Sequence, residues 1–133
     1  MFQEYEVFKL YHSNIENETL NNNFFRKVLF TGKNMQLVVM SLNPGEEIGT
    51  EIHEHVDQFF RIESGRAKFI IDRKEITAKD DEVVIVTAGS KHNVINVGNN
   101  VLKLYTIYAP PNHPDGTINK NKAEAEEYEK HHH

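Results

Sequence analysis

The 133-residue sequence contains no cysteine, which excludes disulfides, iron–sulfur clusters and thiolate-rich zinc sites. Any bound metal must therefore be held by nitrogen and oxygen ligands. No apolar run approaches membrane-spanning length, and the start MFQEYEVFKL has charged residues where a secretory signal has its apolar core. The sequence predicts a soluble cytoplasmic protein with no membrane partner.

Positive charge is also scarce, because 15 Lys and Arg stand against 20 Asp and Glu and give a formal net charge of -5. Lys and Arg occur singly or in pairs such as Arg26-Lys27, which leaves no basic stripe for a phosphate backbone. We therefore expect no nucleic-acid partner. The length fits one ordinary domain, so a single site is expected to carry the function.

Short segments rich in β-branched and aromatic residues occupy most of the chain, separated by turn residues. No helical pattern lies between them, which predicts antiparallel hairpins rather than crossovers. The predicted strands span residues 24–30, 35–42, 58–63, 66–71, 82–86, 91–97 and 101–109. This pattern is typical of an all-β sandwich or barrel.

The two ends of the chain differ from this body. The predicted organisation is a first strand (4–11) and a polar connection in 1–23, a barrel in 24–109, a tail and short helix in 110–130, and three histidines at 131–133 that resemble an expression tag. Three prolines in 110–119 end the sheet, and 121–130 is a good helix former with Asn119 or Asn121 as cap.

Two histidine-containing motifs carry the clearest chemical signal, Gly49-x3-His53-x-His55-x2-Gln58-x6-Gly65 and Thr87-x-Gly89-x2-His92-x3-Asn96. Alternate residues of a strand face the same side, so His53 and His55 are expected to point into the barrel together. A turn after His55 would let Gln58 face inward, and a second turn would bring His92 to the same place. Three imidazoles and one amide oxygen, with open positions for water or substrate, form a site for one divalent metal ion.

These motifs resemble those of the cupin family, Gly-x5-His-x-His-x3-4-Glu-x6-Gly and Gly-x5-Pro-x-Gly-x2-His-x3-Asn. The resemblance covers about 45 to 97 and implies an antiparallel double-stranded β-helix, or jelly-roll barrel. It implies His53, His55 and His92 as metal ligands, with Gln58 at the place of the family's glutamate. The spacing after His55 is one residue short, Thr87 replaces proline, and Asp81 replaces the first glycine of the second motif.

The segments NPGEEIG, DQFFRIESG and YAPPNHPDGT make the chain similar to small stand-alone cupins often labelled mannose-6-phosphate isomerase-like. Phosphosugar isomerase activity does not follow from that label. Cupins are frequently dimers that pair sheet to sheet. Strand 37–42 is apolar on both faces and Phe59 is expected to face outward, so a homodimer is expected from the residues as well.

Four further residues are candidates for a substrate pocket: Phe60, Asn96, Tyr105 and His113. Asn96 can instead tie down a turn or a barrel mouth, and inward aromatic residues can simply be core. His113 lies in a Pro-rich tail that is either surface or folds across the barrel mouth. Gln58 can bind the metal directly or only orient a histidine.

Two classes of function remain open. One is a metal-dependent enzyme, either isomerising a sugar-like or enolisable compound or acting as a dioxygenase with Fe(II) or Mn(II). The other is a non-catalytic module that binds a small molecule. No catalytic residue is assigned, because Gln58 cannot accept a proton. The nitrogen and oxygen donors accept Fe, Mn, Zn, Ni or Co, and an uncompensated metal charge would favour an anionic ligand.

Overall fold

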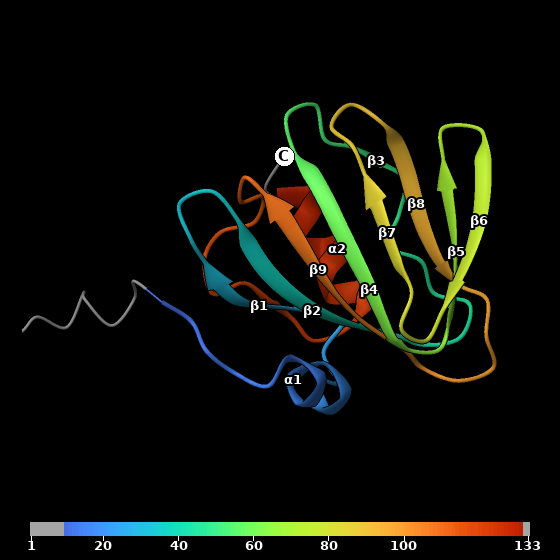
Figure 1. Ribbon diagram of the computed structural model, residues 1–133, viewed down its shortest axis with the longest axis horizontal. Coiled ribbons are helices and arrows are strands. Elements are labelled where there is room, and N and C mark those ends of the chain that lie inside the picture. Colours follow the sequence, from blue (N-terminus) through green and yellow to red (C-terminus); the bar gives the residue numbers. More distant parts are fainter. Residues whose placement is uncertain (1–9, 132–133) are drawn as a thin grey trace, which may run out of the picture.

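The computed structural model describes residues 10–131, which form two antiparallel sheets packed face to face (Figure 1). In chain order the elements are α1 (Ile15–Asn21), β1 (Arg26–Thr31), β2 (Gln36–Leu42), β3 (Glu51–Ile52), β4 (Asp57–Ser64), β5 (Arg66–Ile71), β6 (Lys74–Lys79), β7 (Val83–Val86), β8 (Lys91–Asn96), β9 (Leu102–Ala109), β10 (Ile118–Asn119) and α2 (Lys122–His131). In this part of the chain, no helix is both long and apolar enough to span a bilayer.

The larger sheet has six strands in the order β10-β1-β2-β9-β4-β7, and the smaller has four in the order β3-β8-β5-β6. Within each sheet, all of the paired strands are antiparallel. This arrangement confirms the all-β fold with double-stranded β-helix character that the sequence predicts.

The inner faces of the two sheets form one hydrophobic core. Strand β9 shows the alternation that builds it, since Leu102, Leu104, Thr106 and Tyr108 are buried while the residues between them are partly exposed. Phe60 of β4 meets the other sheet edge to face, with a centroid distance of 5.0 Å to Phe69. Burying such a ring contributes about 1.5–3 kcal/mol, so the core can hold the barrel together while leaving one end polar.

The predicted polar connection contains a helix, which corrects the sequence prediction for residues 12–23. The Oδ1 atom of Asn14 accepts a hydrogen bond from the Asn17 amide at 2.9 Å and caps α1. The helix lies against the outer face of the larger sheet (Figure 1), where Val39 is fully buried. The predicted strand at 4–11 falls mostly outside the described residues, and residues 10 and 11 are not in a strand.

The predicted C-terminal helix is confirmed as α2, and Asn121 is its cap, since its Oδ1 atom accepts from the Glu124 amide at 2.8 Å. The other candidate cap, Asn119, lies in β10 instead. Strand β6 was not predicted because its sequence KEITAK has no apolar run, and most of its residues are exposed in the structure. It exists through its pairing with β5.

We propose that the outer face of the larger sheet is the homodimer contact. Val39 is buried on this face, but Phe59 and Tyr105 stack at 6.1 Å there and Ile85 is 61% exposed. Light scattering at micromolar concentration should give a dimer mass, and Ile85→Glu should give a monomer because a charge cannot enter an apolar contact.

The matched control is Ile76→Glu on the other sheet, where Ile76 is 47% exposed, and this variant should remain dimeric. A monomer mass for the unmodified protein would contradict the proposal.

Candidate metal centre

Three side chains with metal-binding atoms meet at one end of the barrel. Glu51, His53 and His92 each offer one ligand atom, and these atoms lie within 4.8 Å of one another. The backbone sets this meeting, because Glu51 pairs directly with His92 across the β3–β8 ladder and His53 follows β3 at once. The rings of His53 and His92 are 5.4 Å apart, and His53 Nε2 lies 3.2 Å from Glu51 Oε1.

Two buried polar atoms at this end have no hydrogen-bond partner among the described residues, His92 Nε2 and Gln58 Oε1. His92 Nδ1 lies 3.2 Å from the Ser90 carbonyl, to which it can only donate, so we assign its proton to Nδ1 and a lone pair to Nε2. Gln58 Nε2 donates to Thr106 Oγ1 at 3.0 Å, which leaves the Gln58 Oε1 lone pairs free. Since an unsatisfied buried polar atom costs about 1–3 kcal/mol, these donors fit a divalent cation.

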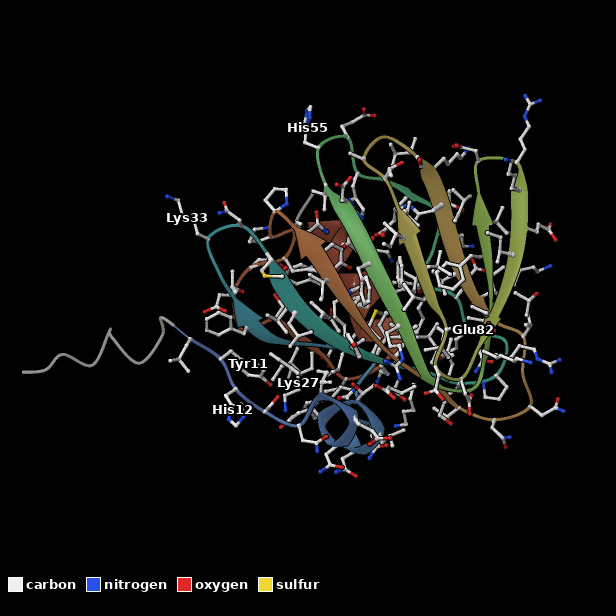
Figure 2. The ribbon with its side chains drawn as sticks, in the orientation of Figure 1. Tyr11, His12, Lys27, Lys33, His55 and Glu82 are labelled. Atoms are coloured by element: carbon white, nitrogen blue, oxygen red, sulfur yellow. The ribbon has the colours of Figure 1, made fainter. Side chains whose placement is uncertain are left out.

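The expected inward pairing of His53 with His55 is not observed. Strand β3 ends at Ile52, and the chain then turns into β4, which begins at Asp57. His55 is exposed in this turn, and Figure 2 shows its ring pointing away from the barrel. The alternation of faces holds only within a strand, so it does not extend to His55.

The structure also explains the irregular spacing noticed in the first motif. The motif reads Gly45-x5-Glu51-x-His53-x4-Gln58-x6-Gly65, which matches the family spacing throughout. Glu51 then stands at the place of the first histidine and His53 at the place of the second. The signal in the sequence was Gly45, which adopts φ +85° and begins the count, whereas counting from Gly49 leads to His55. The donors at this end are thus two imidazoles, a carboxylate and an amide, in place of three imidazoles and an amide.

Two of the pocket candidates lie away from this group. Asn96 ends β8 at the far end from His92, and its Nδ2 atom donates to the carbonyls of Leu42 and Asn100, each at 2.9 Å. It therefore fixes a turn. Tyr105 faces outward from β9 and stacks on Phe59.

The other two candidates lie beside the group. Phe60 is 1% exposed and its ring is 6.4 Å from that of His92, so it forms part of the floor on which His92 packs. His113 lies with Glu51 and His53 at a cavity of about 530 Å³, to which α2 contributes Tyr128. The Pro-rich tail thus folds across the barrel end.

Tyr108 is a further residue of the site, beyond the pocket candidates that the sequence suggests. It is 1% exposed on the inner face of β9, and its hydroxyl lies 3.2 Å from His113 Nε2. Its ring also contacts His53 edge to face at 6.0 Å. Tyr108 and His113 therefore form a polar pair next to the metal-binding group.

Gln36 of β2 holds the tail in this position. Its Oε1 atom accepts from the amides of Asn112 (3.1 Å) and His113 (2.9 Å), and its Nε2 atom donates to the His113 carbonyl (2.7 Å) and to Thr31 Oγ1 (2.9 Å). Gln36 is fully buried, so its amide is completely used.

Replacing Gln36 by leucine should therefore loosen the tail. The backbone groups of residues 112 and 113 lose their partners, which should cost about 1–3 kcal/mol of stability. Urea unfolding should show a lower midpoint, and limited proteolysis should cut first near residues 110–116. Gln36→Glu, which keeps the acceptor, should lose less. An unchanged midpoint and cleavage pattern for Gln36→Leu would show that the clamp does not hold the tail.

The protonation states in the cavity follow from burial and neighbouring charges. Burial lowers the pKa of His113 to about 4, and the positive charges of Arg26 and His53 act in the same direction while Glu51 opposes them. Burial raises the pKa of the Tyr108 hydroxyl. Burial alone would raise the pKa of Glu51, but the hydrogen bond from His53 and nearby positive charges hold it below its usual value. At neutral pH the cavity thus holds a carboxylate, a neutral imidazole and a protonated phenol.

The lowered pKa of His113 predicts a loss of stability in acid. The unfolded chain binds a proton at its ordinary pKa of 6.5 and the folded chain only at about 4, so this part of the stability is complete above pH 6.5 and falls as the pH drops towards 4. Between pH 7 and pH 4.5 the loss should be about 2–3 kcal/mol.

Urea unfolding in the presence of a chelator should show that His113→Gln removes this part of the pH dependence, whereas His12→Gln, at an exposed position, leaves it intact. Equal pH dependence in all three proteins would contradict the burial of a neutral His113.

The model of the cupin domain family matches residues 38–108, which is more than half of the chain. The chain belongs to the cupin family. The chain also resembles a longer protein: it is 51% identical over 118 residues to YrkC of Bacillus subtilis, covering 84% of this chain and 63% of YrkC. It therefore spans less than two thirds of that relative.

Two other relatives extend the comparison. Protein L612 of Acanthamoeba polyphaga mimivirus is 39% identical over 121 residues, which cover 88% of this chain and 76% of L612. The crystal structure of BH2720 from Bacillus halodurans superimposes with a TM-score of 0.88 at 44% identity, covering 90% of this chain and 95% of that one. This likeness supports the cupin fold over nearly the whole chain.

Proposed function

We propose that this cupin is a metal-dependent enzyme that moves a proton on a small enolisable substrate, as in the isomerisation of a sugar-like hydroxycarbonyl compound. One observation carries the proposal: Glu51 and His53, whose ligand atoms converge with that of His92, line the same cavity as His113, and the Tyr108 hydroxyl lies 3.2 Å from His113 Nε2. A cation-binding group and a proton-transfer pair at one cavity are the parts that enolisation needs.

A divalent ion at Glu51, His53 and His92 would polarise a carbonyl oxygen of the ligand and make the adjacent C–H more acidic. His113 is neutral at pH 7, so the nitrogen of its imidazole that carries no proton can accept that proton. The Tyr108 hydroxyl keeps its own proton and can donate a hydrogen bond to a ligand oxygen. His113 thereby fills the role that Gln58 cannot, since an amide does not accept a proton.

A dioxygenase is the second candidate, and the presence of Glu51 favours it. Two histidines and one carboxylate with open positions are typical of non-haem Fe(II) oxygenases. Glu51, His53 and His92 together supply two histidines and one carboxylate. An enolisable substrate would suit this reaction as well, because many such compounds react with dioxygen only after they have lost a proton.

Proton exchange separates these possibilities. Pyruvate and dihydroxyacetone would be incubated with the protein in D2O, without oxygen, with Mn2+, Zn2+ or Fe2+, and deuterium incorporation followed by NMR. We expect exchange that requires metal, is lost in His92→Ala, and falls at least about 100-fold in His113→Gln, while the exposed-site control His55→Gln is unaffected.

Oxygen uptake measured with the same compounds and Fe2+ tests the second candidate. Uptake that needs His92, without anaerobic exchange, would replace the isomerase proposal by the dioxygenase. Neither exchange nor uptake with any of the metals would contradict an enzyme and favour a non-catalytic binding module.

A further inference from the structure

Arg26 of β1 carries a buried charge that the described residues do not neutralise. The side chain is 3% exposed, yet none of the ion pairs between residues 10 and 131 includes it. Its Nη1 atom donates to Asn119 Oδ1 at 3.1 Å, and its Nε atom is buried without a partner. Charged groups are rarely buried without a counter-charge, because removal from water is costly.

Arg26 shares a cavity with Glu51 of the proposed metal centre. Arg26 alternates with Val28 on the inner face of β1 and lines a cavity of about 290 Å³ with Glu51, which also borders the larger cavity. The charge of Arg26 therefore lies at a cavity that reaches the candidate metal group through Glu51.

Arg26 contacts neutral groups, the Asn119 amide and the face of the Phe25 ring (5.4 Å to its centroid), and these contacts preserve its charge. Asn119 has the shape of aspartate but no charge, so it orients the guanidinium without neutralising it. With a divalent ion bound, the charges of the ion, Glu51 and Arg26 would sum to about two positive charges. A ligand that carries negative charge would be strongly favoured there.

We infer that Arg26 binds the carboxylate of a small ligand whose other oxygen atoms reach the metal centre, so that the substrates are small 2-oxo or 2-hydroxy acids. A guanidinium presents a planar fork of donors that matches a carboxylate with two parallel hydrogen bonds. This inference rests on the proposed function for the identity of the site and adds the class of substrate.

Calorimetric binding of pyruvate and of its neutral amide, pyruvamide, tests the inference, with the protein as purified and after chelation. The unmodified protein should bind pyruvate at least about tenfold more tightly than pyruvamide. Arg26→Gln should weaken pyruvate binding by at least about tenfold and leave pyruvamide binding and metal content unchanged. Arg61→Gln is the matched control, because Arg61 faces outward and pairs with Asp81, and it should change nothing.

Asn119→Asp is a second variant that keeps Arg26. The new carboxylate should pair with the guanidinium and compete with the ligand, so pyruvate binding should again fall at least about tenfold. This variant decides the matter if Arg26→Gln does not fold, which circular dichroism would reveal.

Pyruvate affinity that is unchanged in Asn119→Asp and in a folded Arg26→Gln would overturn the inference, as would equal binding of pyruvate and pyruvamide by the unmodified protein. Failure of the proposed function would look different: pyruvate would still bind through Arg26, but no metal-dependent proton exchange or oxygen uptake would follow.

Discussion

Replacing His92 by alanine is expected to reduce the metal content of the purified protein to background. His92 Nε2 is a buried atom without a partner, so its lone pair has no use in the fold other than to bind a ligand. His53→Ala should have the same effect, because each imidazole is one of few donors in the group. Elemental analysis should show the loss of metal, and chelator competition should show an affinity at least about 100-fold lower. Replacing a residue that only orients a ligand costs about 10–100-fold, so a larger loss indicates direct binding.

His55→Ala is the control, since it removes an imidazole two residues from His53 that is exposed in the turn. It should keep the full metal content. The barrel should remain folded in all three variants, because its core lies between the sheets. Loss of metal in His55→Ala, or full occupancy in His92→Ala, would contradict the assignment of Glu51, His53 and His92.

Exchanging the charges of Glu51 and Gln58 should change metal affinity in opposite directions. Glu51→Gln removes the only carboxylate in the group and should weaken binding by about 1–3 kcal/mol after desolvation is counted. Gln58→Glu adds a carboxylate where Oε1 now lacks a partner and should tighten binding by a similar amount. The double variant has the original charge and should bind metal with nearly the original affinity.

Chelator competition at fixed pH measures these three variants and Gln58→Ala. If Gln58→Glu and Gln58→Ala both leave the affinity unchanged, Gln58 does not touch the ion and acts only through Thr106, to which it donates a hydrogen bond. If Glu51→Gln leaves it unchanged, the carboxylate is not a ligand and serves only to orient His53.

The strands of the barrel could be predicted because their apolar residues are buried on one face, as in β4 and β9. The short pieces could not. Strand β3 has two residues and is defined by its partner β8, so its own residues do not show that it ends at Ile52, and only the count from Gly45 points to Glu51 and His53. This single boundary decides which histidine faces inward, and it explains why His55 was expected in place of Glu51.

Other parts of the site depend on contacts that are distant in sequence. Helix α1 is seven residues long and polar, so its existence depends on its cap and on packing against the sheet. Arg26 alternates with Val28 along β1, and this alternation places its side chain on the inner face. The position could not be predicted from the residue type, because charged residues are normally expected on the outside. His113 could be proposed at the mouth, but the clamp by Gln36 joins residues 77 positions apart.

Anomalous diffraction from crystals of the Mn2+-loaded protein tests the central assignment most directly. The account predicts one strong peak per chain within bonding distance of a Glu51 oxygen, His53 Nε2 and His92 Nε2, at the end of the barrel that the 110–119 tail covers. A peak at His55 or at the terminal histidines, with no peak beside His92, would contradict it.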